Sequence, residues 1–157
     1  MTLSYTLDHD RYLADVRASG KVTLSDAIHA VRGVAADVAH DGYGCLVDVR
    51  EMDFFPTVME LKEISFEFIR LRAAFRAGTV FIVSNDRHYA LGRFLAMLVD
   101  TAGIRMAVFK DPAQAEHWLH THTGAHRIRT KESRAATAPG AASTQTGAGY
   151  TRPTPPA

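Results

Sequence analysis

The sequence predicts a single α/β domain whose sheet is mixed, mostly parallel and flanked by helices. Short apolar segments typical of buried strands alternate with longer segments in which apolar residues recur every three or four positions. The segment from Gly44 to Val49 is apolar apart from Asp48, as expected of a central strand covered on both faces. Two strand-like segments precede the first helical pattern, so we expect the element order ββαβαβαβα.

The first half of the chain carries start and stop signals for these elements. Residues 3–7 and 12–19 are strand-like, and the turn-forming triplet between them predicts a hairpin. A helix is expected next, because Thr23 and Asp26 have the spacing of a capping box. This helix is expected to end near Gly42, directly before the central strand.

A second capping box, formed by Thr57 and Glu60, opens the next predicted helix behind Pro56. The apolar stripe of this helix contains Leu61, Ile64, Phe68, Leu71 and Phe75. Burial of the stripe, at about 1.5–3 kcal/mol for each side chain, is expected to outweigh the cap, which contributes about 1 kcal/mol.

The remaining elements follow the same alternation. A strand over residues 79–83, a helix capped near Asn85, a strand over residues 105–109 and a last helix with Pro112 in its first turn complete the pattern. We place the folded domain at residues 1–123. Residues 124–157 are rich in Ala, Thr, Pro and Gly and lack apolar periodicity, so they are predicted to form a disordered tail.

Charge and composition exclude several classes of function. Residues 1–124 hold 13 basic and 16 acidic side chains, a net charge of −3, which argues against nucleic acid as a partner. The single cysteine cannot form an internal disulfide, and we interpret it as a small core residue. No apolar stretch is long enough to span a membrane and no signal peptide is evident, so a cytoplasmic protein is expected.

The order and spacing of short motifs over about residues 1–121 resemble the SpoIIAA-like family, whose members are relatives of STAS domains. These motifs read G-K-V-T, L-V-D-V-R, I-V-S-N-D, Y-A-L-G-R and V-F-K-D-P-A-Q-A-E-H-W-L. The resemblance implies a STAS-like sheet and a superfamily of non-catalytic regulators that bind anti-sigma factors. The fold has also been compared with CRAL-TRIO lipid-transfer proteins, which implies an apolar ligand as an alternative.

One position departs from the STAS pattern. Regulators of that type place a phosphorylatable serine in an Asp-Ser-Ser-Gly turn, nine or ten residues past the aspartate of the strand. Counted from Asp48, this place falls on Thr57 and Val58, where a hydroxyl is present but the surrounding motif is not. Phosphorylation of Thr57 is therefore a weak hypothesis, and its role as an N-cap is the favoured interpretation.

Ligands of open α/β sheets bind outside the carboxyl ends of parallel strands, which focuses attention on one edge of the predicted sheet. The candidate ligand-binding residues at this edge are Asp48, Arg50, Phe54, Phe55, Asn85, His88, Tyr89 and Arg93. We expect them to form an apolar pocket with a polar rim. The alternative is structural, with ion pairs that fix the loops and phenylalanines that pack onto the sheet.

Catalysis, metal binding and cofactor binding are not expected. Ser84 and His88 are suitable residue types for nucleophilic chemistry, but the chain has no G-x-S-x-G elbow and no Walker loop. His117 and His120 share a helix face without a second ligand pair, so no metal site is assigned. An enzyme remains the third hypothesis, with no reaction specified.

The function expected first is a non-catalytic regulatory or protein-binding module. The alternative is a carrier or sensor of a small apolar or lipid ligand, held at the carboxyl edge of the sheet. A homodimer is also expected, because Met59 and Phe66 lie off the main apolar stripe of their helix and would otherwise face water.

Overall fold

Five strands form one sheet in the order β1-β2-β3-β4-β5 in the computed structural model, which describes residues 2–38 and 42–123. The strands are β1 (Thr2–Asp8), β2 (Leu13–Lys21), β3 (Gly44–Asp53), β4 (Thr79–Ile82) and β5 (Met106–Phe109). The helices are α1 (Leu24–Val38), α2 (Val58–Arg70), α3 (Asp86–Asp100) and a last helix over residues 112–123. β1 pairs with β2 in antiparallel fashion and every other pairing is parallel, which confirms the predicted hairpin, element order and mixed sheet.

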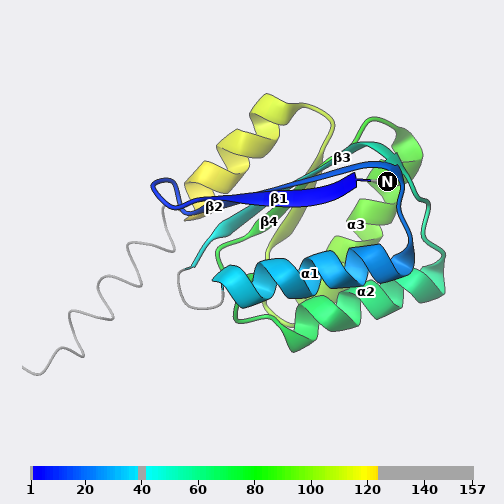
Figure 1. Cartoon of the computed structure of the whole chain (residues 1–157), viewed down its shortest axis with the longest axis horizontal. Coiled ribbons are helices and arrows are strands. Elements are labelled where there is room, and N and C mark those ends of the chain that lie inside the picture. The colour runs from blue at the N-terminus through cyan, green and yellow to red at the C-terminus, as the bar shows by residue number, and fades with distance from the viewer. Residues whose placement is uncertain (1, 39–41, 124–157) are drawn as a thin grey trace, which may run out of the picture.

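The helices divide between the two faces of the sheet. α1 and α2 lie together on one side, and the helix over residues 112–123 lies on the other (Figure 1). Alternation along β3 explains the division, because Cys45 packs in the cluster with α1, α2 and α3, whereas Leu46 packs against the last helix. The predicted tail, residues 124–157, lies outside the described residues and stays a prediction.

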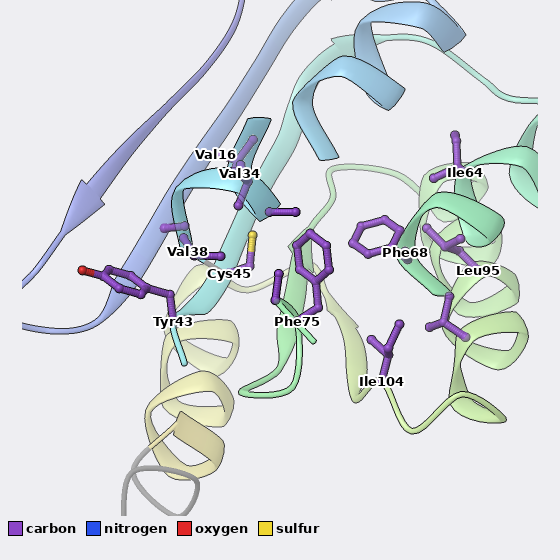
Figure 2. Close-up of a cluster of buried hydrophobic side chains, with 14 of the residues drawn as sticks. Val16, Val34, Val38, Tyr43, Cys45, Ile64, Phe68, Phe75, Leu95 and Ile104 are labelled. Carbon is purple, nitrogen blue, oxygen red and sulfur yellow. The ribbon is translucent and has the colours of Figure 1, made fainter. Parts of the chain in front are cut away.

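The main core fills the space between the sheet and the first three helices. Figure 2 shows it as a contiguous group in which side chains of β2 and α1 meet those of α2 and α3. Phe68 and Phe75 are in edge contact at its centre, with ring centroids 4.8 Å apart. A smaller cluster on the opposite face joins Leu46, Val80 and Leu119.

The predicted helix starts are confirmed in their atomic detail. At the start of α1, the Thr23 backbone N–H donates to Asp26, and the Asp26 N–H donates back to the Thr23 hydroxyl. Thr57 and Glu60 make the same reciprocal pair of bonds at the start of α2. These bonds satisfy N–H groups that a helix cannot pair within itself, so the caps fix where each helix begins.

The end of α2 differs from the prediction, which extended the helix to Phe75. α2 ends at Arg70, and the chain continues through turns in which N–H groups bond three residues back instead of four, as from Ala74 to Leu71. These tighter turns rotate the following side chains, yet Phe75 remains only 2% exposed. The apolar pattern therefore identified the buried residues correctly, although it did not identify the backbone that carries them.

A cluster of three charged residues joins α1 to α2. The Glu67 carboxylate accepts hydrogen bonds from Arg32 at 2.8 and 3.1 Å and from Arg70 at 2.7 Å. Its side chain is 12% exposed, whereas the two arginines are about half exposed. Hydrogen bonds from the two guanidiniums lower the pKa of Glu67 to about 2. The ion pair between Arg32 of α1 and Glu67 of α2 therefore links these two helices.

Candidate functional site

An apolar cavity of about 130 Å³ lies between the sheet and the three helices of the main core. Its floor is the face of the sheet that carries Val47 and Phe81, in the central strands β3 and β4. Its walls include Val31 of α1, Ile64 of α2 and Leu95 of α3. Every one of these side chains is apolar, so the cavity is hydrophobic.

Side chains at the centre of the sheet are incompletely buried, which shows that the cavity is a gap in the packing. Val47 and Phe81 sit on inner strands and face the helices, but both are only partly buried. On α1, the residues that line the cavity include the small residues Ala27 and Ala30. Interiors normally pack closely, so partial exposure at the middle of a sheet is uncommon and points to space that a guest molecule could fill.

Gly92 of α3 contributes to the shape of this cavity. A Cβ at this position would lie 2.8 Å from one methyl of Val108 in β5 and 3.1 Å from the other. The absence of a side chain therefore lets α3 lie close against β5, while Gly92 itself lines the cavity. This close approach is the structural reason for a glycine inside a helix, where it costs about 1 kcal/mol relative to alanine.

Residues 54–56, which follow β3, close one side of the cavity and are fastened to α3 by His88. Phe54 and Pro56 line the cavity, as does His88, which is 4% exposed. The His88 Nε2–H group donates to the carbonyl of Phe54 at 2.9 Å. A buried histidine therefore ties residues 54–56 to the start of α3.

The capping of α3 assigns the proton on this histidine. The Asn85 Oδ1 atom accepts the His88 backbone N–H at 2.8 Å, which turns the amide nitrogen of Asn85 toward the imidazole. That nitrogen lies 3.1 Å from His88 Nδ1 and donates to it. With Nδ1 an acceptor, the ring proton belongs on Nε2, and both nitrogens are engaged.

Phe55 packs on the outer side of this arrangement. Its ring stacks on His88 with centroids 4.3 Å apart and an interplanar angle of 10°. The guanidinium of Arg87 lies 4.2 Å from the centroid of the Phe55 ring. Phe55 thus supports the wall from outside, while Phe54 forms part of its inner surface.

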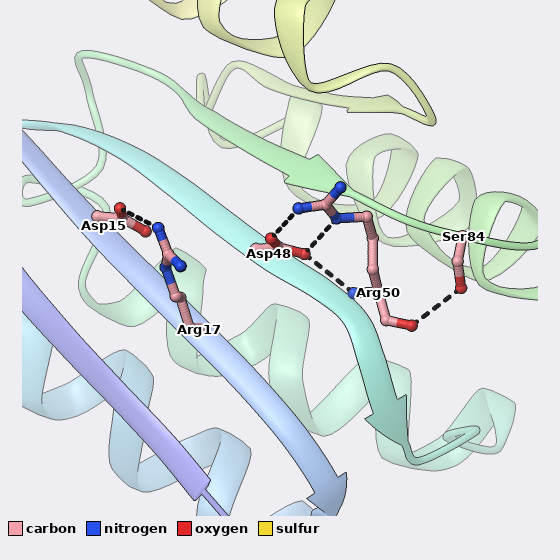
Figure 3. A network of polar contacts seen from close by, with 5 residues as sticks. All are labelled: Asp15, Arg17, Asp48, Arg50 and Ser84. Atoms are coloured by element: carbon pink, nitrogen blue, oxygen red, sulfur yellow. Dashed lines mark hydrogen bonds and ion pairs between the residues drawn. The ribbon is translucent and has the colours of Figure 1, made fainter.

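Two of the candidate residues, Asp48 and Arg50, lie on the opposite face of the sheet. Side chains alternate along a strand, so positions 48 and 50 point away from the cavity that Val47 and Val49 line. Arg50 donates to Asp48 at 3.0 and 2.7 Å, and the Ser84 hydroxyl donates to the Arg50 carbonyl at 3.0 Å (Figure 3). The predicted polar rim is therefore separated from the apolar pocket.

The surroundings of Asp48 form a polar groove, lined by Arg17, Arg50 and Glu51 among others. Hydrogen bonds from Arg50, helped by the charge of Arg17, lower the pKa of Asp48. Arg17 itself pairs loosely with Asp15 at 3.4 Å and is largely exposed (Figure 3). Acidic and basic groups alternate here and neutralise one another, so this groove favours no single sign of ligand charge.

The last candidates are exposed on α3 or at a helix start. Tyr89 is 38% exposed, with the Lys110 ammonium 6.0 Å from its ring centroid, and Arg93 is also exposed. Neither residue lines the cavity. Thr57 is engaged as the N-cap of α2, and its proposed phosphorylation stays a prediction. Of the eight candidate ligand residues, the structure therefore brings together Phe54, Phe55, Asn85 and His88.

Apart from Phe54 and His88, the residues that line the cavity were not among the predicted site residues. Their sequence signal was weak, because Ala27, Ala30 and Gly92 are ordinary residues of amphipathic helices. Cys45 also lines the cavity, and burial, with a smaller effect of Asp15, raises the pKa of its thiol to about 12. The thiol is therefore protonated at neutral pH and adds to the apolar lining.

Within residues 2–38 and 42–123, no group of three His, Cys, Asp or Glu side chains is arranged to hold a metal ion. Across the same residues, none of the helices combines the length and the apolar character needed to cross a membrane.

Comparison with known proteins identifies the fold class. No family model and no curated protein matches the chain. A solved structure does: an uncharacterized protein of the DUF3478 family from Shewanella loihica PV-4, described as having a SpoIIAA-like fold, superimposes with a TM-score of 0.54. The match covers 75% of this chain and 92% of that one at 16% identity. The domain therefore has a SpoIIAA-like fold, as the motif order implied.

Proposed function

We propose that this domain is a non-catalytic binding module that holds a small apolar molecule between its sheet and helices α1, α2 and α3. The observation that carries the proposal is the partial exposure of Val47 and Phe81 to an apolar cavity at the centre of the domain. An apolar guest would remove this surface from contact with water or empty space, which is favourable at about 25 cal/mol for each Å² covered. The site differs from the pocket expected from the sequence, because it lies beneath residues 54–56 and not at the rim.

The chemistry of the lining supports binding over catalysis. A nucleophile or general base needs an accessible group in a reactive protonation state. The Cys45 thiol is protonated, and both nitrogens of His88 are occupied by protein partners. The groups around the cavity are thus suited to enclosing a molecule and offer little with which to transform one.

The test is native mass spectrometry of the purified wild type and of the variant Ala30→Phe, in which the new side chain is designed to fill the cavity. We expect wild type to carry extra mass that is lost on denaturation, and Ala30→Phe to carry none, because the new ring occupies the space of the guest. Ala36→Phe places the same ring on the exposed face of α1 and is the matched control.

If the guest is lost in purification, xenon binding under pressure tests the cavity, and NMR of the Val47 methyl groups detects it. Xenon is suitable because it enters apolar cavities without regard to shape or charge. Saturable shifts in wild type and Ala36→Phe, and none in Ala30→Phe, are expected. Absence of both carried mass and xenon binding in wild type would overturn the proposed function.

A second function, protein binding of the regulatory kind that the resemblance implies, is favoured by the outer surface of α2. Val58, Met59 and Phe66 are 55%, 65% and 69% exposed, although large apolar side chains usually avoid water. We propose that this surface binds a protein, and that a second copy of the chain is the first partner to test.

Light scattering of wild type is expected to give twice the mass of one chain. The double variant Met59→Ser with Phe66→Ser is expected to give the mass of one chain, because its contact surface has lost its apolar side chains. Met97→Ser, which changes an exposed apolar side chain on α3, is the control and should leave the dimer intact. A wild type that scatters as a single chain would refute the dimer.

A further inference from the structure

We propose that the ligand of the cavity is an uncharged aromatic molecule of one or two rings, and that it carries no acid group. This inference rests on the proposed function and specifies its ligand. It follows from three observations: the lining carries no charge, the volume of the cavity is small, and several of the surrounding side chains are aromatic.

The lining offers nothing to a charged group. None of the described residues that line the cavity is Asp, Glu, Lys or Arg, and its exposed surface is almost wholly apolar. The His88 nitrogens are engaged by Phe54 and Asn85, so the imidazole presents only its ring face. An ionised carboxylate taken from water into such a site would be left unpaired, which is strongly unfavourable.

The arginine nearest to this wall does not change that conclusion. The Arg87 guanidinium lies 4.2 Å from the centroid of the Phe55 ring, and neither Arg87 nor Phe55 lines the cavity. Arg93 is exposed on α3 and does not line the cavity. A fatty acid held in the cavity would therefore find no cation beside its carboxylate.

The volume limits the ligand to about the size of one or two rings. A dry apolar cavity of about 150 Å³ in another protein accepts benzene or xenon, and the cavity here measures about 130 Å³. Long acyl chains are larger than this space. The lipid ligands that the resemblance to CRAL-TRIO proteins implied are therefore too large for it.

Aromatic side chains surround the space on several sides. Phe81 lies on the floor, Phe68 and Phe75 on the side of α2, and Phe54 and His88 on the side of residues 54–56. Aromatic rings gain about 0.5–1.5 kcal/mol beyond area burial when they stack or meet edge to face. A flat aromatic guest can make such contacts, whereas a saturated ring of equal size cannot.

The experiment compares matched probes by NMR of the Val31 and Val47 methyl groups in wild type and Ala30→Phe. Toluene and indole are expected to give saturable shifts in wild type that are absent in Ala30→Phe. Benzoate, which has the same ring with a carboxylate, is expected to bind at least about 100-fold more weakly. Decanoate tests the size limit, and methylcyclohexane tests the preference for aromatic faces; both are expected to bind more weakly than toluene.

Each result bears on the ligand class or on the function itself. Binding of benzoate or decanoate as tight as that of toluene would overturn the inference and leave the proposed function in place. Equal binding of methylcyclohexane and toluene would overturn the aromatic preference. Failure of all five probes, together with failure of xenon, would remove the proposed function as well.

Discussion

Replacing Phe75 by alanine is expected to lower the free energy of unfolding by about 3–5 kcal/mol, since this ring is among the largest fully buried side chains. The ring contacts Phe68 and lies in the main core (Figure 2). Its removal loses the free energy gained by transferring the ring from water to the core, and the cavity left behind adds a further cost. Urea unfolding followed by circular dichroism measures the loss.

The same variant tests the cavity, because Phe75 lines it. Truncation enlarges the space, so naphthalene is expected to stabilise Phe75→Ala more than it stabilises wild type. A ligand at about 100 times its Kd would return about 2.7 kcal/mol. Met97→Ala, at a side chain that is 60% exposed, is the control and should change stability by less than about 0.5 kcal/mol. A loss below about 1 kcal/mol for Phe75→Ala would contradict the described packing.

Replacing Glu67 by glutamine is expected to remove about 1 kcal/mol of stability at pH 7 and to make that loss depend on pH. The folded pKa of Glu67 is about 2, below its ordinary value of 4.5, because Arg32 and Arg70 donate to the charged carboxylate. A lowered pKa stabilises the fold above pH 4.5, and the contribution is lost as the pH falls from 4.5 through 2. The arginines are half exposed, so solvent screening keeps the effect small.

Urea unfolding of wild type and Glu67→Gln between pH 2 and pH 7 measures this effect, and the two stability curves should converge at the acid end. Glu63→Gln removes an exposed carboxylate from the same helix, and its stability should match that of wild type at every pH. A constant difference between wild type and Glu67→Gln at every pH would show that the ion cluster is not the cause.

Local sequence signals predicted most of the fold. Capping boxes such as Thr57 with Glu60 act over three residues, so their geometry could be inferred from spacing alone. The end of α2 could not, because the turns after Arg70 keep Phe75 buried and leave the apolar pattern unchanged. Periodicity reports which side chains are buried, and several backbone paths satisfy the same pattern.

The candidate site was predicted in part, and the reason lies in the sheet. Phe54, Phe55, Asn85 and His88 meet because two neighbouring parallel strands end at the same edge. Asp48 and Arg50 were expected at this edge because the apolar segment ends at Val49, whereas β3 continues to Asp53 and strand alternation places both side chains on the other face. The cavity arises because small side chains of α1 and α3 leave space above the sheet. This space exists only after both helices are packed on the sheet, so the sequence alone does not reveal it.

If the proposed guest enters beside residues 54–56, the hydrogen bond between His88 and the Phe54 carbonyl affects the rate at which the guest exchanges and not its affinity. Displacement of residues 54–56 from α3 would break that bond and separate the Phe55 ring from the His88 ring. Both contacts form again when residues 54–56 return, so their energy cancels from the equilibrium between free and occupied states. For the guest proposed above, these contacts would raise the barrier to entry and exit on this side, and would lengthen its residence time without tightening its binding.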